Sequence, residues 1–243
     1  MVIIADTHTH TIASTHAYST LLENVAHAKK IGIKLIASTD HCPALPGAPQ
    51  LWYFHNMKAF PDVINGVGVL KGCECNILDY KGNLDMTQKD LERLDWVIAS
   101  FHNQVCEPGT PEQHTNAYLE VAKNPHIDVI GHCGDQRFRF DYERVIPVFK
   151  EYGKLVEINN HSFTSRPGSD VNCREIARLC KKYELPVVVS TDAHFCTEIG
   201  EFSKSIALLQ ELDFPEHLVM NADFDRFMEL VTQKSGRSFA GIE

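Results

Sequence analysis

The clearest absence from this chain is a long apolar run. Within its 243 residues no apolar stretch approaches the roughly 20 residues that a membrane-spanning helix needs. The N-terminus lacks a basic segment followed by a long apolar one, so a secretory signal peptide is not expected either. These absences predict a cytoplasmic protein without a membrane partner.

Runs of basic residues are absent too. The chain has 23 Lys and Arg against 32 Asp and Glu, which gives a formal net charge of −9. A surface that binds the nucleic-acid backbone needs clustered positive charge, so nucleic acid is not expected as a partner. A small anionic substrate stays compatible with the acidic balance, because bound metal ions can dominate the charge of a site.

Motifs for covalent catalysis and nucleotide binding are missing. There is neither a G-x-S-x-G elbow nor a phosphate-binding G-x-x-x-x-G-K-[ST] loop. Eight cysteines in a long chain of cytoplasmic character do not predict a disulfide framework. Cys73 and Cys75 lack a second close pair at zinc-ribbon spacing, and on a strand Glu74 would face away from both. We interpret the cysteines mainly as small buried hydrophobic residues.

Short apolar runs alternate with helical patterns along the whole chain. Seven strands are expected, at 2–5, 33–38, 67–73, 96–100, 128–131, 155–158 and 186–190. Capping boxes at Thr20 and Thr110 predict helices that end near residues 32 and 123. Further helices are expected at 141–152, 172–183, 201–212 and 223–232, with a long loop at 43–60. Alternating strands and helices indicate βαβ units. We expect one α/β domain over residues 1–243, either a barrel, which the pattern favours, or an open doubly wound sheet.

Two histidines lie one residue apart close to the N-terminus. On a strand, residues i and i+2 point to the same side, so His8 and His10 would project together. Two such imidazoles can bind one metal ion, or they can be polar residues at the end of a strand. The pair alone does not distinguish these alternatives.

Six of the seven expected strands end in a histidine or a carboxylate. The candidates are, in chain order, His8, His10, His16, His41, Glu74, His102, His132, Asp192 and His194. In parallel α/β folds the C-terminal strand ends share one face, so these groups are expected to converge. Neutral histidine together with carboxylate suits zinc, manganese or iron. Nine candidates exceed the three or four protein ligands of one zinc ion, so two or three divalent ions are expected.

The remaining histidines are expected to have other roles. No metal ligation is expected for His27, His55, His114, His126 and His217, whereas His161 is a candidate to line the pocket. Asp6 and Asp40 precede candidate ligands, and we expect them to orient histidines. Trp52, Tyr53 and Phe163 give the pocket loops a partly aromatic outline.

The ordered set of H-x-H, a downstream histidine, T-D-H, a strand-end glutamate, two strand-end histidines and D-x-H resembles the PHP (polymerase and histidinol phosphatase) superfamily. Within it, the chain is most similar to the small stand-alone YcdX-like phosphatases. The segments STHAYST at 14–20, INN at 158–160, SRPGS at 165–169 and NCRE at 172–175 strengthen this comparison. The resemblance covers nearly the whole length and implies a distorted, TIM-like (β/α)7 barrel with the metal site at the C-terminal strand ends. Asn103, Gln104 and Cys133 depart from the pattern and leave the substrate preference open.

The resemblance also implies a ligand set for three ions. The first would be held by His8, His10, Glu74 and Asp192, and the second by His16, His41 and His194. The third would be held by His102, His132 and a bridging Glu74. Zinc suits these histidines best, with Mn²⁺ or Fe²⁺ as alternatives.

The activity expected from such a centre is the hydrolysis of a phosphate monoester. A metal ion lowers the pKa of bound water from about 15.7 to roughly 7, and two ions roughly 3.5–4 Å apart hold the attacking and leaving oxygens. A small phosphorylated substrate would thus be attacked by metal-bound hydroxide at a trinuclear centre, without a covalent intermediate. Asp192 and His194 would also steer the water, and Arg166 would clamp the phosphate through its planar guanidinium.

Three other functions fit some of these residues. One is a metal-dependent 3′–5′ exonuclease or phosphodiesterase, which the acidic balance disfavours. Another is a non-catalytic metal-binding scaffold, which the complete ligand set disfavours. The third is hydrolysis of a C–N bond, as in amidohydrolase-like barrels, which usually use fewer ions.

Overall fold

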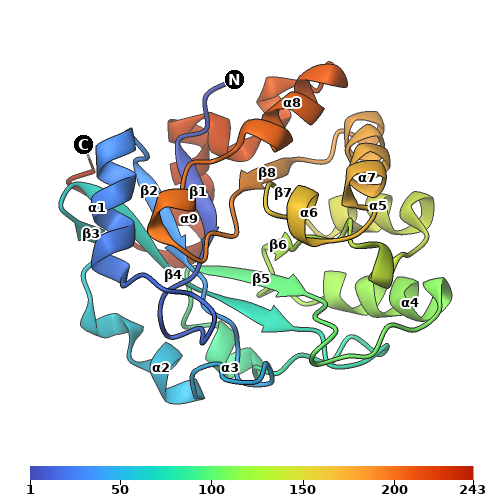
Figure 1. Ribbon diagram of the computed structural model, residues 1–243, viewed down its shortest axis with the longest axis horizontal. Helices are drawn as coiled ribbons and strands as arrows, with labels where there is room; N and C mark the ends of the chain where they lie inside the picture. Colours follow the sequence, from blue (N-terminus) through green and yellow to red (C-terminus); the bar gives the residue numbers. More distant parts are fainter. Residues whose placement is uncertain (243) are drawn as a thin grey trace.

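A parallel sheet wrapped into a nearly closed barrel forms the centre of the molecule (Figure 1). The computed structural model describes residues 1–242. The strands follow the order β1-β2-β4-β5-β6-β7-β8. They are β1 (Ala5–Thr9), β2 (Leu35–Ser38), β4 (Val67–Asn76), β5 (Trp96–Ser100), β6 (Val129–Ile130), β7 (Leu155–Asn159) and β8 (Val187–Ser190). The expected α/β barrel is confirmed, and the open doubly wound alternative is wrong.

One buried side chain, that of Asn221, bonds both the first and the last strand of the barrel. Asn221 is fully buried between them, and its Nδ2 donates to the carbonyl oxygens of Ala5 (2.8 Å) and Val189 (2.6 Å). Its Oδ1 accepts from the amide of Val189 at 3.0 Å. A single backbone bridge, between Thr9 and Ala193, lies at the other end of this seam. The amide of Asn221 therefore satisfies backbone groups that a regular strand ladder would otherwise pair.

Helices cover the outside of the barrel. Capping boxes at Thr20 and Thr110 begin α1 (Leu21–Ile31) and α4 (Pro111–Ala122), as predicted. Three further expected helices are present, each within a few residues of the expected bounds: α5 (Tyr142–Glu151), α8 (Ser203–Glu211) and α9 (Phe224–Ser235). The helix expected at 172–183 is α7 (Ser169–Tyr183), which begins one turn earlier because Gly168 precedes it with φ of 71°.

Several short elements were not expected from the sequence. The segment 43–60 is not only loop, because it contains α2 (Leu51–His55) and a 3₁₀ turn at Met57–Ala59. Two further single-turn helices are α3 (Gln88–Leu91) and α6 (Ser162–Ser165). The two-residue strand β3 (Val63–Ile64) pairs antiparallel with β4. Elements this short carry too little periodicity for a sequence pattern to indicate them.

The first strand lies further along the chain than its apolar residues suggested. It was expected at 2–5 and is found at Ala5–Thr9, because polar residues that serve the site make up most of it. Its pairing with β2 shifts between Asp6 and Thr9, which face Ile36 and Ser38. Three steps along β1 thus match two along β2, which is the geometry of a β-bulge. The extra residue lets Ala5 face the barrel interior while His8 also points inward, three positions later.

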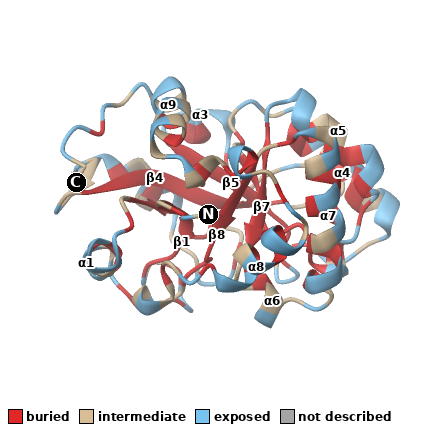
Figure 2. Cartoon of the chain, turned by 90° about the horizontal axis from the view of Figure 1, so that it is seen from above, coloured by how far each residue is buried: buried red, intermediate tan, exposed pale blue. Residues whose placement is uncertain are grey.

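Two apolar layers hold the barrel together, one inside it and one between the strands and the helices. Figure 2 shows the strands buried and the helices exposed on their outer faces. The inner layer includes Leu35, Leu70 and Trp96, and α9 covers the N-terminal strand ends by packing Phe227 against Trp96 with ring centroids 5.6 Å apart. The C-terminal strand ends stay free for polar groups. Among residues 1–242, no helix combines the length and the apolar character that crossing a membrane requires.

Candidate metal centre

The nine expected ligands meet at the C-terminal ends of the strands. His8 lies within β1 and Glu74 within β4, while the other seven lie in the segments that directly follow β1, β2, β5, β6 and β8. Seven of the nine are buried, His194 is partly exposed, and His16 is exposed. Its ring stacks 4.5 Å from that of His194 and 5.0 Å from that of His41. The barrel therefore assembles residues that are up to 186 positions apart, from His8 to His194.

Glu74 lies at the middle of this cluster, and its carboxylate is completely buried. Five imidazole nitrogens surround it. Near Oε2 lie His41 Nδ1 (2.7 Å), His8 Nε2 (3.4 Å) and His10 Nε2 (3.6 Å), and near Oε1 lie His132 Nε2 (2.8 Å) and His102 Nε2 (3.3 Å). One carboxylate thus links two groups of histidines, one at each oxygen.

The carboxylate of Asp192 is shared in a similar way. Its Oδ1 lies 3.1 Å from Nε2 of His10 and 3.5 Å from Nε2 of His8. Its Oδ2 accepts from Nδ2 of Asn159 at 3.2 Å and from Nη2 of Arg166 at 2.9 Å. One oxygen therefore faces the histidines, and the other is held by the protein.

The spacing of these atoms fits a bound ion. Ligand atoms that bind zinc tetrahedrally at 2.0–2.1 Å lie about 3.3 Å from one another. The nitrogens of His8 and His10 lie 3.1–3.6 Å from the oxygens of Glu74 and Asp192. Among residues 1–242, several buried atoms of the cluster form no hydrogen bond of acceptable geometry, even where two of them lie close together: Nε2 of His8, His102 and His194, both ring nitrogens of His41, and Oε2 of Glu74. Unpartnered buried polar atoms are costly, so the cluster fits a divalent cation.

The opposite nitrogen of several rings is held by the protein. Nδ1 of His8 lies 2.7 Å from Oε1 of Glu157, and Nδ1 of His102 lies 2.8 Å from Oδ1 of Asn76. Nδ1 of His194 lies 2.8 Å from the carbonyl oxygen of Asp192. Because each partner is an acceptor, Nδ1 carries a proton and Nε2 faces the cluster. This is the arrangement in which histidines bind metal ions.

Glu157 was missed from the sequence. It lies in β7, which corresponds to the sixth strand expected at 155–158, the one at whose end no histidine or carboxylate was assigned. Besides His8, its carboxylate accepts from the backbone amide of His132 at 2.5 Å and from the hydroxyl of Ser190. The signal was present, since a glutamate inside an otherwise apolar strand that is buried on both faces needs a charged or polar partner.

The electrostatics of the site suit a cation. Burial raises the pKa of Glu74, but His102 and His8 outweigh that effect and hold it well below its usual range. Burial lowers the pKa of His10 well below its ordinary value, and His41 and His194 add to the decrease. Burial also lowers the pKa of His8, yet Glu157, Asp192 and Glu74 raise it overall to well above its ordinary value. The cluster thus attracts a positive charge at the point where these carboxylates meet.

Two of the clustered residues adopt strained backbone conformations. Asp192 has φ of 57° and His132 has φ of 25°, both in the left-handed region that side chains with a Cβ rarely adopt. Each residue follows directly after a strand and turns its side chain toward Glu74 or His10. Such strain persists where the surrounding structure enforces it, and it is concentrated at functional sites.

The comparisons with known proteins identify the family. The family model described as the PHP domain matches residues 6–161. The chain belongs to the PHP domain family. A "Probable phosphatase" of Acetivibrio thermocellus is 48% identical over 98% of both chains, and a "Probable phosphatase" of Clostridium botulinum is 44% identical over 95% of both.

Solved structures share the fold of this PHP domain at low sequence identity. The histidinol phosphate phosphatase of Lactococcus lactis, complexed with zinc, L-histidinol and phosphate, superposes with a TM-score of 0.63 and 16% identity. That match covers 88% of this chain and 95% of the other. A chain of an archaeal ribonuclease P with mature tRNA has a TM-score of 0.60 at 13% identity, covering 95% and 91%. Likeness at this identity shows the fold alone.

A cavity of about 450 Å³ opens beside the clustered histidines of the PHP domain. His161, the histidine expected as a candidate to line the pocket, does line this cavity, and so does Arg166. The expected aromatic outline is wrong, because the lining contains Phe101 in place of Trp52, Tyr53 and Phe163. Tyr53 donates its hydroxyl to Oδ2 of Asp40 at 2.7 Å, and Trp52 is 81% exposed. Proline and aromatic content indicated neither the short helix α2 that carries Trp52 and Tyr53 nor the direction in which these side chains point.

Asp6 and Asp40, which were expected to orient histidines, do not hydrogen-bond to the imidazole of any proposed ligand among the described residues. Asp6 accepts from the backbone and hydroxyl of Thr191 and from the backbone of Gly200, so it ties β1 to the segment after β8 and contacts no imidazole. Asp40 accepts from the hydroxyl of Ser14 at 2.7 Å, and that hydroxyl lies 3.4 Å from Nδ1 of His10. Only Asp40 is therefore connected to a ligand ring, through Ser14.

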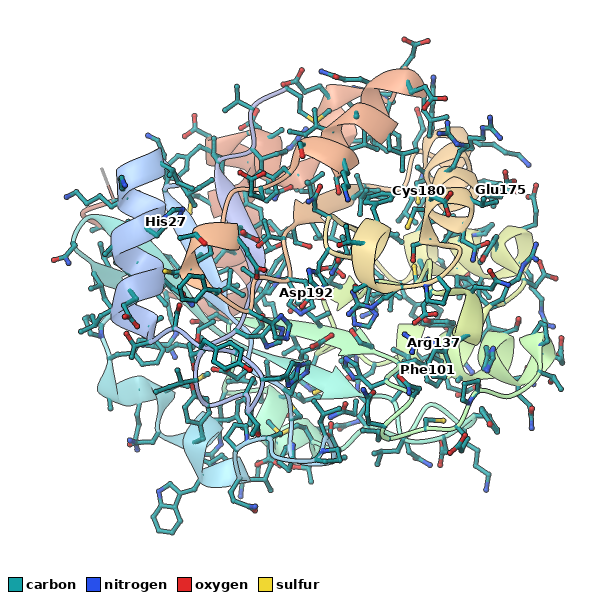
Figure 3. The ribbon with its side chains drawn as sticks, in the orientation of Figure 1. His27, Phe101, Arg137, Glu175, Cys180 and Asp192 are labelled. Atoms are coloured by element: carbon teal, nitrogen blue, oxygen red, sulfur yellow. The ribbon has the colours of Figure 1, made fainter. Side chains whose placement is uncertain are left out.

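The other histidines lie outside the cluster. Figure 3 shows His27 on α1, well away from Asp192. His55 pairs with Asp90 at 2.7 Å, and both ring nitrogens of His114 are bound to backbone groups. Cys73 and Cys75 face the outer apolar layer, on the opposite side of β4 from Glu74, as predicted.

Proposed function

We propose that this PHP domain is a metal-dependent phosphatase that hydrolyses phosphate monoesters of small molecules. The observation that carries the proposal is the set of buried, unpartnered imidazole nitrogens around Glu74, next to a cavity that Arg166 lines. The two relatives named probable phosphatases support the reaction type. The zinc in the Lactococcus lactis structure supports the choice of metal.

Nine residues are proposed as ligands of three zinc ions, and the whole chain is proposed to act as one catalytic domain. The first ion would be held by His8, His10, Glu74 and Asp192, the second by His16, His41 and His194, and the third by Glu74, His102 and His132. The distances around Glu74 support its proposed role as a bridge. His8, from the first ligand set, lies near Oε2, whereas His102 and His132, from the third set, lie near Oε1 of the same carboxylate. Mn²⁺ or Fe²⁺ would accept the same donors.

The chain supplies few negative charges to such a centre. Of the nine proposed ligands only Glu74 and Asp192 are acidic, so divalent ions held here keep an excess of positive charge. A phosphate dianion would therefore be attracted to this end of the barrel. When bound, the ions would provide a water of lowered pKa and would neutralise charge that develops on the phosphate oxygens.

Arg166 is proposed to bind the phosphate group that is transferred. Its guanidinium is 13% exposed and lines the cavity, and Nη1 is 3.2 Å from the hydroxyl of Ser162. The contacts with Ser162 and Asp192 leave part of its planar fork free for phosphate oxygens. Asp192 and His194 are proposed to orient the attacking water, since both face the cluster close to Arg166.

The test is elemental analysis of protein purified without a chelator, together with turnover of p-nitrophenyl phosphate, bis(p-nitrophenyl) phosphate and single-stranded DNA. We expect bound zinc, turnover of the monoester, loss of turnover after dialysis against a chelator, and recovery with Zn²⁺ or Mn²⁺. His194→Ala should abolish turnover with the fold intact by circular dichroism. His27→Ala, a histidine outside the cluster, should leave it unchanged.

Three results would contradict the proposal. Turnover of the diester or of DNA without the monoester would indicate a phosphodiesterase or exonuclease. Retained metal without turnover of any phosphoester would indicate a non-catalytic scaffold. Turnover that survives complete removal of metal would overturn the metal-dependent reaction itself.

A further inference from the structure

Part of the cavity wall has no role in the proposed chemistry. Besides the histidines and Arg166, the cavity is lined by Phe101, Asn103 and Gln104, which lie at or after the end of β5, and by Asp135 and Arg137, which lie after β6. Figure 3 shows Arg137 and Phe101 together, on the same side of Asp192. A phosphate held at the metal centre would place its leaving group within reach of this wall.

Arg137 is fixed in place although its side chain is 37% exposed. Its Nε lies 3.0 Å from both carboxylate oxygens of Asp135, and its Nη2 lies 2.6 Å from Oδ2. Its Nη1 donates to Oδ1 of Asn103 at 2.9 Å. These contacts use three of the five N–H donors of the guanidinium and leave one on each terminal nitrogen. Arg137 therefore presents two fixed N–H donors to the cavity, and Asp135 neutralises the positive charge of its guanidinium.

The amides beside Arg137 complete a polar surface of mixed character. Asn103 and Gln104 are exposed to the cavity, and each amide offers both donors and an acceptor. A hydroxyl group also donates and accepts, so a leaving group with several hydroxyls matches this wall. A leaving group that carried a second phosphate would gain little electrostatic attraction from Arg137, because Asp135 already neutralises its charge. An amine would find no free carboxylate, because Asp135 is the acidic residue among the described lining residues and is held by Arg137.

We propose that Asn103, Gln104 and Arg137 form a leaving-group subsite that selects phosphate monoesters of sugars or other polyols. The proposal rests on the phosphatase function proposed above and names its substrate class. A cavity of about 450 Å³ has the size of sites that hold one small metabolite. The subsite would act on specificity alone, because among residues 1–242 none of the three side chains forms a hydrogen bond or ion pair with a proposed metal ligand.

The experiment compares kcat/KM of the metal-loaded enzyme for ribose 5-phosphate, histidinol phosphate and p-nitrophenyl phosphate. The first leaving group carries several hydroxyls, the second is a cation, and the third is an aromatic group without further hydroxyls. For the unmodified protein we expect the highest kcat/KM with ribose 5-phosphate. In Asn103→Ala and in Arg137→Met, the loss of one or two hydrogen bonds should lower kcat/KM for ribose 5-phosphate about threefold to tenfold, while p-nitrophenyl phosphate changes by less than about twofold.

Arg139→Met is the matched control, because Arg139 is an exposed arginine two positions away that does not line this cavity. It should leave all three values unchanged. Equal losses for ribose 5-phosphate and p-nitrophenyl phosphate in both Asn103→Ala and Arg137→Met would overturn the subsite, as would a preference for histidinol phosphate. The absence of turnover with all three esters would overturn the phosphatase function instead, so the two failures are distinguishable.

Discussion

Nη2 of Arg166 lies 2.9 Å from Oδ2 of Asp192, while Oδ1 of the same carboxylate faces His8 and His10. This pair connects the proposed phosphate ligand directly to a proposed metal ligand. The positive charge of Arg166 also helps to hold the pKa of Asp192 well below its usual range, against the effect of burial and together with His8. The proposed phosphate site and the proposed metal site therefore share one carboxylate.

Replacing Arg166 should separate these two roles. Arg166→Lys keeps the positive charge beside Asp192 but loses the planar fork that contacts phosphate. Loss of a hydrogen bond to a charged group costs roughly 1.5–3 kcal/mol, which corresponds to about a 10- to 100-fold rise in KM for p-nitrophenyl phosphate. The zinc content, measured by elemental analysis, should stay that of the unmodified protein. A fall in zinc content with unchanged KM would assign Arg166 to the metal centre alone.

Glu157 is predicted to position His8. Glu157→Gln removes the charge that accepts from Nδ1 of His8, and loss of such a partner typically costs 10- to 100-fold in metal affinity or activity. Competition with a fluorescent zinc chelator would measure the affinity. Glu175→Gln changes an exposed glutamate on α7 (Figure 3) and should have no effect. If Glu157→Gln only lowered the unfolding temperature, with zinc affinity intact, the role of Glu157 would be structural.

The proposed bridging role of Glu74 predicts a difference in stoichiometry. Glu74→Gln should lose at least two of the three proposed ions, because its carboxylate approaches two groups of histidines. His16→Ala should lose one, since His16 lies at the exposed rim near His41 and His194. Zinc per chain, measured by elemental analysis on both variants, tests this. Equal zinc content in the two variants would contradict the bridge.

Stability should depend on pH through His114, away from the metal centre. Burial lowers the pKa of His114, whose Nε2 accepts from the amide of Gly109 at 2.8 Å. The unfolded chain takes up this proton below about pH 6.5 and the folded chain does not, so the free energy of unfolding falls as the pH decreases through that range. His114→Gln should show a smaller decrease between pH 7.5 and 5.5 in urea denaturation. An equal decrease in both proteins would remove His114 as a cause.

The fold and most of the cluster could be predicted because both depend on local patterns. Apolar runs identified all seven barrel strands, and a polar residue after an apolar run identified the candidate ligands. The first strand was misplaced for the same reason, because polar residues such as Asp6 and His8 form the strand itself. Glu157 was missed because it lies inside its strand, and a pattern of polar residues at strand ends does not indicate such a position.

The wall of the cavity was harder to predict, because it depends on how loops fold back. Trp52 and Tyr53 are close in sequence to His41, yet Tyr53 turns to Asp40 and Trp52 points to solvent. Arg137 and Asn103, 34 residues apart, meet through a hydrogen bond that no sequence pattern indicates. Hydrophobic periodicity indicates which face of a helix or strand is buried, but it does not indicate which loops contact one another.

The seam of the barrel gives a final prediction, on stability. Asn221→Ala would remove the amide that bonds Ala5 and Val189, and would leave up to three buried backbone groups without a partner. Each such group costs about 1–3 kcal/mol, so the free energy of unfolding should fall by at least about 2 kcal/mol in urea denaturation. Asn160→Ala changes an asparagine that is not fully buried and lies outside the seam, and should cost less. Because Asn221 joins β1 to β8, which carry His8 and lead to Asp192, zinc affinity should decrease with the stability. A stable Asn221→Ala protein with unchanged zinc affinity would show that the backbone bridge from Thr9 to Ala193 is sufficient to close the barrel.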